Sequence, residues 1–230
     1  NENYIKEQLN KLNKFKILND DYDYTKEIIK LTTSANPRSI KRLINNLFLL
    51  EIMGEQNKEL QAFFNEDPKA IKILFAICCI QIEYEKIYNL IKAQYDFWGW
   101  KVEDKEIRKI KDEGKDLGKF LSRNDEKEYM NEPWEIKLAI DSFNDYQPNE
   151  ILKISKLLNF IKQYFNEEFL ENSTLIVDAI KFTSFASDST DKGSSEENVN
   201  LPNQLQVRRQ KYIERFLEKL EKLEPEYFYD

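Results

Sequence analysis

The chain contains no histidine, the side chain most often used as a general base and as a metal ligand at neutral pH. Catalytic sites that pair a histidine with a serine or a cysteine are therefore excluded within this chain, and so are zinc sites with histidine ligands. Glycine and proline are also scarce, at five and six residues out of 230. Turn-rich β architectures use many of both, and here leucine, isoleucine, lysine, glutamate and asparagine dominate. The composition therefore favours an all-α fold.

Cysteine occurs only as Cys78 and Cys79, which are adjacent within an apolar run. Neighbouring cysteines are poorly placed for an ordinary structural disulfide, so we interpret them as reduced thiols packed in a core. Reduced thiols, and the lack of an apolar signal segment at residues 1–4, predict a cytoplasmic protein. The apolar run at residues 70–82 is too short to span a bilayer, so no membrane span is expected. The chain begins with asparagine instead of methionine, which indicates a fragment of a longer protein.

Acidic residues outnumber basic ones by 42 to 35, and the net charge of −7 argues against general nucleic-acid binding. Three of the acids, Asp20, Asp21 and Asp23, stand just before a helical pattern. A calcium-binding loop would need a glycine turn and a bidentate glutamate, and both are missing. We therefore interpret these aspartates as capping and solvating residues, with Asp23 as the helix cap.

The most informative stretch is TSANPRSIKRLINNL, at residues 33–47. Asn36 suits an N-cap, because its side-chain oxygen can accept a hydrogen bond from a free amide of the first turn. Pro37 then falls at the first helical position and Gly54 stands where the helix should stop, so the spacing predicts a helix over residues 37–53. The apolar residues of this helix share one face: Ile40, Leu43, Ile44, Leu47 and Phe48.

The opposite side of this predicted helix is basic. It carries Arg38, Lys41, Arg42 and, further along, Asn45. The amides of a first turn form the positive end of the helix dipole, which favours bound anions. A fixed arginine with two further cations at that end indicates a phosphate-facing surface. The alternative is a plain solvated face, which is common opposite an apolar stripe.

Further helices are predicted from apolar periodicity, caps and prolines at residues 4–14, 24–31, 68–95, 133–143, 148–170 and 204–223. Residues 55–61 are expected to form a polar connection. Residues 173–185 are ambiguous between helix and strand, and helix is favoured. Residues 101–132 are rich in charge and predict a solvated helix around residues 103–113 followed by a loop.

The fold predicted from these elements is an all-α, multi-helix bundle in four parts. We expect a helical lid-like subdomain at residues 1–96, a second helical subdomain at 97–186, a flexible loop or linker at 187–203, and a C-terminal helix at 204–230. Three tryptophans are interpreted as core or subdomain-interface aromatics more than as a base-stacking platform: Trp98, Trp100 and Trp134.

Recognisable catalytic motifs are missing from the sequence. A Walker A loop needs glycine-rich amides around a phosphate, plus a lysine and a hydroxyl, and no such spacing occurs. A dinucleotide fingerprint is absent too, since Gly114 and Gly118 form only a two-glycine pattern in a charged stretch, where a plain turn is favoured. We therefore expect no catalysis and no metal site in this chain alone.

The segment SANPRSIKRLIN, at residues 34–45, resembles the lid signature of KAP-family P-loop NTPases, (G/A)NPR-x-IKR followed by a hydrophobic residue and a nearby asparagine. It is similar more broadly to the sensor-2 segment of AAA+ ATPases. The close resemblance covers residues 33–50. A looser one, to a helical lid followed by a buried helix, extends to about residue 95. The Walker A and Walker B elements would lie upstream of residue 1.

This resemblance implies an arginine that senses nucleotide. Arg38 would reach the β- and γ-phosphates of ATP, bound with Mg²⁺ in the upstream P-loop core of the same polypeptide. Asn36 and Pro37 would set the helix start that aims it, and Lys41 and Arg42 would face nucleotide, that core or a neighbouring protomer of a homo-oligomer. The parent protein would be an ATPase with a place in bacterial anti-phage defence, while the fragment alone would bind no cofactor.

A different class of function is also open, that of a helical adaptor that binds protein or nucleic acid and has no nucleotide role. Its contact surface would be the C-terminal helix, whose basic residues are Arg208, Arg209, Lys211 and Arg215. Glutamates on the same helix offset these charges, so a protein partner is favoured over nucleic acid. Leu49 and Leu50 are expected to be exposed near the basic side, where they would contact the upstream core or a second copy of the chain.

Overall fold

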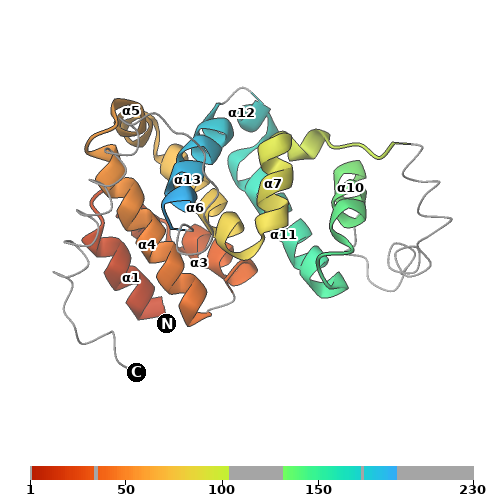
Figure 1. Cartoon of the computed structure of the whole chain (residues 1–230), viewed down its shortest axis with the longest axis horizontal. Coiled ribbons are helices and arrows are strands. Elements are labelled where there is room, and N and C mark those ends of the chain that lie inside the picture. The colour runs from red at the N-terminus through yellow and green to blue at the C-terminus, as the bar shows by residue number, and fades with distance from the viewer. Residues whose placement is uncertain (1, 34–35, 104–131, 172–173, 191–230) are drawn as a thin grey trace, which may run out of the picture.

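The computed structural model describes residues 2–33, 36–103, 132–171 and 174–190. These ranges contain eleven α-helices, one 3-10 helix and no strand, so the predicted all-α class is confirmed. In chain order (Figure 1) the elements are α1 (Glu2–Lys11), α2 (Ile17–Asp20), α3 (Tyr22–Leu31), α4 (Pro37–Gly54), α5 (Lys58–Glu66), α6 (Pro68–Glu83), α7 (Glu85–Ala93), η1 (Phe97–Gly99), α10 (Pro133–Ser142), α11 (Pro148–Phe165), α12 (Glu167–Glu171) and α13 (Leu175–Thr190). None of these helices is both long and apolar enough to cross a membrane.

Helix α6 lies at the centre of the bundle. Its sequence is apolar on nearly every side, and the residues from Ala70 to Ile80 are buried except for Lys72. Helices α13, α4, α7 and α5 pack against it, and Figure 1 shows it behind α13 and between α4 and α7. Cys78 and Cys79 are fully buried free thiols within this helix, as predicted. Burial in apolar surroundings raises the pKa of both thiols above the ordinary value.

Helix α4 begins as predicted but ends for a different reason. The Asn36 side chain accepts a hydrogen bond from the Arg38 amide at 3.1 Å, and Pro37 is the first helical residue. Gly54, which we predicted to stop the helix, is its last helical residue and does not have a positive φ. Glycine is needed there for space, because a Cβ atom would stand 2.6 Å from Cε2 of Phe64 on α5.

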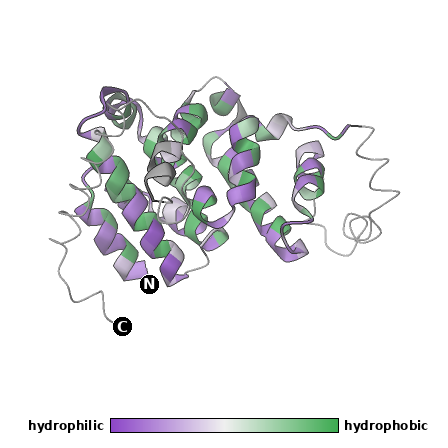
Figure 2. Cartoon of the chain, in the orientation of Figure 1, coloured by the Kyte–Doolittle hydropathy of each residue, from purple (hydrophilic) through white to green (hydrophobic). Residues whose placement is uncertain are grey.

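The C-terminal half of α4 is covered by other helices. Residues 46–54 are all buried, and α1, α5, α6 and α13 pack against this helix. The prediction that Leu49 and Leu50 are exposed is therefore wrong. Figure 2 shows that the N-terminal part of α4 is mainly hydrophilic and its C-terminal part mainly hydrophobic. The exposed surface of α4 is thus concentrated in its first turns.

Helices α5 and α3 begin at residues that the prediction missed. Helix α5 starts inside the stretch 55–61, because Asn57 accepts hydrogen bonds from two amides of its first turn at 2.9 and 3.2 Å. Its buried residues are Leu60, Phe63 and Phe64. Helix α3 is capped by Asp21, whose Oδ1 accepts from the Tyr24 amide at 3.4 Å, so Asp23 is not the cap.

Two predicted long helices are each broken in the structure. The predicted helix 68–95 is divided into α6 and α7 at Tyr84, where the backbone leaves helical geometry. The Tyr84 side chain is buried, and its hydroxyl donates to the Leu31 carbonyl at 3.0 Å. The predicted helix 148–170 is divided at Asn166, which has a φ of 68° and separates α11 from α12.

The core is continuous across the predicted boundary between residues 1–96 and 97–186. One buried apolar cluster contains residues from both ranges. Helix α13 packs on α6, and the rings of Phe182 and Phe63 meet edge to face with centroids 5.3 Å apart. The Tyr88 hydroxyl of α7 donates to the Ile180 carbonyl of α13 at 3.2 Å. Packing does not separate the two ranges, and their division into subdomains stays a prediction.

An aromatic group around Phe97 joins η1 to α10. The Phe97 ring meets the rings of Trp98, Trp100 and Trp134 edge to face, with centroids 5.1, 6.4 and 5.7 Å apart. Trp100 and Trp134 are buried and Trp98 is half-buried. The interpretation of these tryptophans as core aromatics is therefore confirmed.

The favoured helix at residues 173–185 is confirmed by α13. This helix continues to Thr190, so the first four residues of the predicted linker 187–203 are helical. The rest of that linker lies outside the described residues, and so do residues 104–113 of the helix predicted around 103–113 and the whole helix predicted at 204–223.

Candidate functional site

The predicted phosphate-facing residues lie together on the first two turns of α4. Arg38, Lys41 and Arg42 are all exposed there. The Asn36 cap fixes the start of the helix, and the Asn36 amide donates to the Thr33 carbonyl at 2.7 Å. The first amides of a helix have no partner inside it, so this end adds a partial positive charge to the three cations.

Ser39 attaches this first turn to the central helix. Its side chain is buried, and its hydroxyl donates to Oε2 of Glu83 at 2.9 Å. Glu83 is the last residue of α6. Any rotation of α4 that moved Arg38 would have to break this hydrogen bond or carry the end of α6 with it.

Lys153 of α11 makes a second attachment close to the same point. Its Nζ donates to the carbonyl of Thr32, the C-cap of α3, at 3.1 Å. Burial lowers the pKa of Lys153, and the carboxylates of Glu83 and Glu150 oppose that shift. The ends of α3 and α6 and the first half of α11 therefore meet near the start of α4.

The two arginines of the site are available for an external anion. Neither Arg38 nor Arg42 makes an ion pair or a side-chain hydrogen bond with the residues that the structure describes, whereas Lys41 has an interaction within the protein. A guanidinium group presents a planar fork of donors that matches two oxygens of a phosphate or carboxylate. This arrangement is chemically suited to binding a phosphate or a carboxylate.

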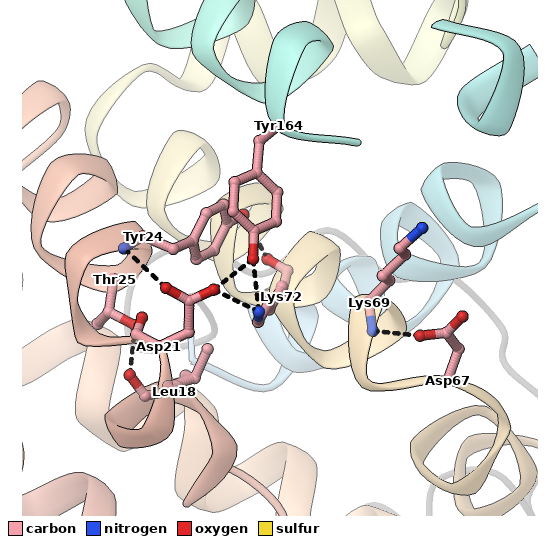
Figure 3. A network of polar contacts seen from close by, with 8 residues as sticks. All are labelled: Leu18, Asp21, Tyr24, Thr25, Asp67, Lys69, Lys72 and Tyr164. Atoms are coloured by element: carbon pink, nitrogen blue, oxygen red, sulfur yellow. Dashed lines mark hydrogen bonds and ion pairs between the residues drawn. The ribbon is translucent and has the colours of Figure 1, made fainter. Parts of the chain in front are cut away.

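A second polar cluster connects α3, α6 and α11 (Figure 3). Lys72 Nζ lies 2.6 Å from Oδ2 of Asp21 and donates to the Tyr164 hydroxyl at 2.5 Å, while that hydroxyl donates to the same carboxylate oxygen. The Tyr24 hydroxyl donates to the Lys72 carbonyl at 2.9 Å. The expected capping role is thus confirmed for Asp21, which also holds this ion pair. The cluster holds α11 against α3 and α6. Its two charged groups, Asp21 and Lys72, are paired with each other.

Low pH should weaken the interactions that Asp21 makes with Lys72 and Tyr164. The hydrogen bonds from Lys72 and Tyr164 hold the pKa of the Asp21 carboxyl below its ordinary value. The carboxylate therefore stabilises the fold above the unfolded pKa of about 4, and this contribution is lost as the pH falls through the lower folded pKa. Asp21→Asn keeps a capping side chain and should lower the free energy of unfolding at pH 7 by about 1 kcal/mol, because the pair is partly exposed.

Urea denaturation at pH 7 and at about pH 3, below the unfolded pKa, would measure this effect. We expect the difference between Asp21→Asn and the unsubstituted chain to shrink at the lower pH. Asp20→Asn is the matched control, because Asp20 is an exposed neighbour and its carboxylate has no ion pair with any described residue. Equal pH dependence of the two variants would contradict the role given to Asp21.

Ser39, Glu83 and Lys153 were not identified from the sequence. Ser39 lies inside the recognised motif, but nothing in its local pattern indicates that it is buried. Glu83 and Lys153 are 44 and 121 residues away from their partners in the chain, so no local spacing connects them to the site.

The remaining predicted contact residues, Arg208, Arg209, Lys211 and Arg215, lie outside the residues that the structure describes. Within the described ranges, no group of three or more cysteine, aspartate or glutamate side chains is placed to hold a metal ion. Comparison of the chain with protein-family models, with curated proteins and with solved structures gives no match. The candidate site therefore consists of the first turns of α4 and the residues that hold them.

Proposed function

We propose that this chain is the helical lid and C-terminal region of a P-loop NTPase, and that Arg38 contacts the terminal phosphate of ATP bound in an upstream core. The observation that carries this proposal is the start of α4, where an asparagine cap and a proline precede an exposed arginine that has no carboxylate partner among the described residues. An arginine at the positive end of a helix suits a phosphate. The resemblance of residues 34–45 to the KAP-family lid signature supports the same role.

In this proposal the chain supplies positive charge and the upstream core supplies the rest of the ATP site. Arg38 would hold an oxygen of the γ-phosphate, and Lys41 and Arg42 would add positive charge beside it. The ligands of Mg²⁺ would come from the upstream core. Bound nucleotide would then bring the start of α4 toward that core.

The attachments of α4 would make the described bundle follow this movement. The Ser39–Glu83 hydrogen bond connects the first turn to α6, and the Lys153–Thr32 hydrogen bond connects the preceding residues to α11. A shift of Arg38 toward a phosphate would therefore pass into the bundle as a rigid-body closure.

Replacing Arg38 by alanine in the full-length protein is expected to weaken ATP binding by about 1.5–3 kcal/mol, or roughly ten- to 150-fold, because a charge-assisted contact is lost. ADP binding should change little, since ADP lacks the γ-phosphate. Arg38→Lys keeps the charge but loses the planar fork, so its effect should be intermediate. Titration calorimetry with both nucleotides would measure the preference for ATP over ADP.

Lys92→Ala is the control, because Lys92 is an exposed cation on α7. It should leave the preference for ATP unchanged. If Arg38→Ala also left that preference unchanged, Arg38 would not be a phosphate sensor. A silent Arg38→Ala together with loss of a protein partner in Arg208→Glu or Arg209→Glu would instead identify the chain as a helical adaptor.

A further inference from the structure

Ser39 is the first residue of α4 whose side chain is buried, at 8% exposed, while Pro37 and Arg38 before it are exposed. A buried hydroxyl needs a hydrogen-bond partner, and this one donates to Oε2 of Glu83 at 2.9 Å. In an α-helix with 3.6 residues per turn, neighbouring side chains leave the axis about 100° apart. The bond that fixes the direction of Ser39 therefore also fixes the direction in which Arg38 leaves the helix.

Glu83 is a fixed acceptor, because the residues around it hold it in place. It is the last residue of α6, and the side chain of the next residue, Tyr84, is buried. The Tyr84 hydroxyl donates to the Leu31 carbonyl at 3.0 Å, and its ring meets that of Tyr146 edge to face with centroids 5.9 Å apart. The positive charge of Lys153 also acts on the Glu83 carboxylate. The first turn of α4 is thus held against a part of the bundle that is itself anchored to α3 and to the segment between α10 and α11.

A second buried serine among the described residues also donates to a glutamate. Ser155 is 5% exposed, donates to Oε1 of Glu135 at 2.6 Å, and joins α11 to α10. The two bonds are alike in chemistry but differ in what lies beside them. Ser39 is adjacent to Arg38, which is exposed and has no ion pair with any residue that the structure describes. A guanidinium fork matches two oxygens only in a limited set of orientations, so the bond at Ser39 controls a property that matters for an anion.

We propose that Ser39 and Glu83 are positioning residues for Arg38. Their hydrogen bond sets the rotation of the first turn of α4, so that the guanidinium meets the γ-phosphate with its donors facing two oxygens. A small misplacement of a positioned group weakens its interaction without removing it. The inference rests on the proposed function, because it assigns both residues to the same ATP site. It makes them part of the discrimination between ATP and ADP although neither touches the nucleotide.

Titration calorimetry of the full-length protein with ATP and with ADP tests this role. Ser39→Ala and Glu83→Ala should each lower the preference for ATP over ADP by about fivefold, less than Arg38→Ala, because the arginine is kept but misdirected. Glu83→Gln removes the charge and keeps an oxygen that accepts from the Ser39 hydroxyl, so it should retain the preference. An equal loss in Glu83→Gln and Glu83→Ala would assign the effect to charge and overturn the positioning role.

Ser155→Ala is the matched control, because it removes the same kind of bond between two other helices. It should lower stability to urea as Ser39→Ala does and leave the preference for ATP unchanged. Equal effects of the two variants on that preference would overturn the proposal. If Arg38→Ala lost the preference while Ser39→Ala and Glu83→Ala kept it, the positioning role would be wrong and the proposed function would stand. If Arg38→Ala kept it, both would be wrong.

Hydrogen exchange in the unsubstituted full-length protein gives a measurement that needs no variant. The coupling is reciprocal, so ATP bound at Arg38 should stabilise the end of α6 to which Ser39 is attached. The Tyr84 amide, which donates to the Ile80 carbonyl at 2.7 Å, should exchange more slowly with ATP than with ADP. Equal exchange of this amide with the two nucleotides would contradict the coupling through Glu83.

Discussion

In urea denaturation, replacement of Trp134 by alanine is expected to lower the free energy of unfolding by about 3–5 kcal/mol. Trp134 is only 1% exposed and is among the largest buried side chains of the described residues. Its ring lies 5.7 Å from that of Phe97, and its Nε1 donates to Oε2 of Glu132 at 2.7 Å. The substitution removes this hydrogen bond and leaves a cavity between η1 and α10, which the neighbouring rings fill only in part.

Two further substitutions separate the contribution of the hydrogen bond from the contribution of ring packing. Trp134→Phe keeps an aromatic ring but loses the hydrogen bond, so it should cost about 1–2 kcal/mol. Trp98→Ala removes the same chemical group from a half-buried position beside Phe97, and its effect should be smaller than that of Trp134→Ala. A loss below about 1 kcal/mol in Trp134→Ala, the size expected at a surface position, would contradict the packing described for this ring.

Replacement of Gly54 by leucine should lower the free energy of unfolding by about 3 kcal/mol or more, because the site is already full. A Cβ atom there would stand 2.6 Å from Cε2 and 3.0 Å from Cδ2 of Phe64. The Phe64 ring is held by Phe15, which meets it edge to face at 5.5 Å. The ring therefore cannot move away without disturbing the contact between α5 and the segment after α1. Thermal and urea denaturation would both report the loss.

Gly54→Ala tests the same steric clash with a smaller side chain. Its clash should outweigh the gain in helix propensity of about 1 kcal/mol. Adding Phe64→Leu should recover part of the loss, because it removes the ring that clashes. Gly99→Ala is the control: Gly99 is exposed, and its nearest obstacle is the Asp96 carboxylate at 3.1 Å. Wild-type stability of Gly54→Leu would show that α4 and α5 do not approach as closely as described.

Helix starts marked by a proline could be predicted from sequence because their determinants are local, whereas the Asn57 cap of α5 and the Asp21 cap of α3 are also local and were missed. The prolines at residues 37, 68, 133 and 148 each take the first position of a helix, as expected. Helix ends and breaks depend on distant residues. The break at Tyr84 accompanies a hydrogen bond to Leu31, which is 53 residues away, and apolar periodicity continues through it.

The candidate site, like the helices, could be predicted only where local sequence determines it. Arg38, Lys41 and Arg42 follow Asn36 and Pro37 at fixed spacing, so their exposure at one helix end follows from the helix itself. The attachment of Lys153 to the Thr32 carbonyl could not be predicted, because the two residues are 121 apart in the chain. Only the packing of α11 against α3 brings them together.

The two buried thiols of α6 can report when this helix separates from the helices packed around it. Cys78 and Cys79 are fully buried, and burial suppresses the thiolate that an alkylating reagent needs. A reagent can therefore reach them only after α6 has separated from the helices around it. The rate of alkylation would therefore measure how often this separation occurs, without an introduced label. A lower rate in the presence of a partner or a nucleotide would show that the bound molecule makes the separation less frequent.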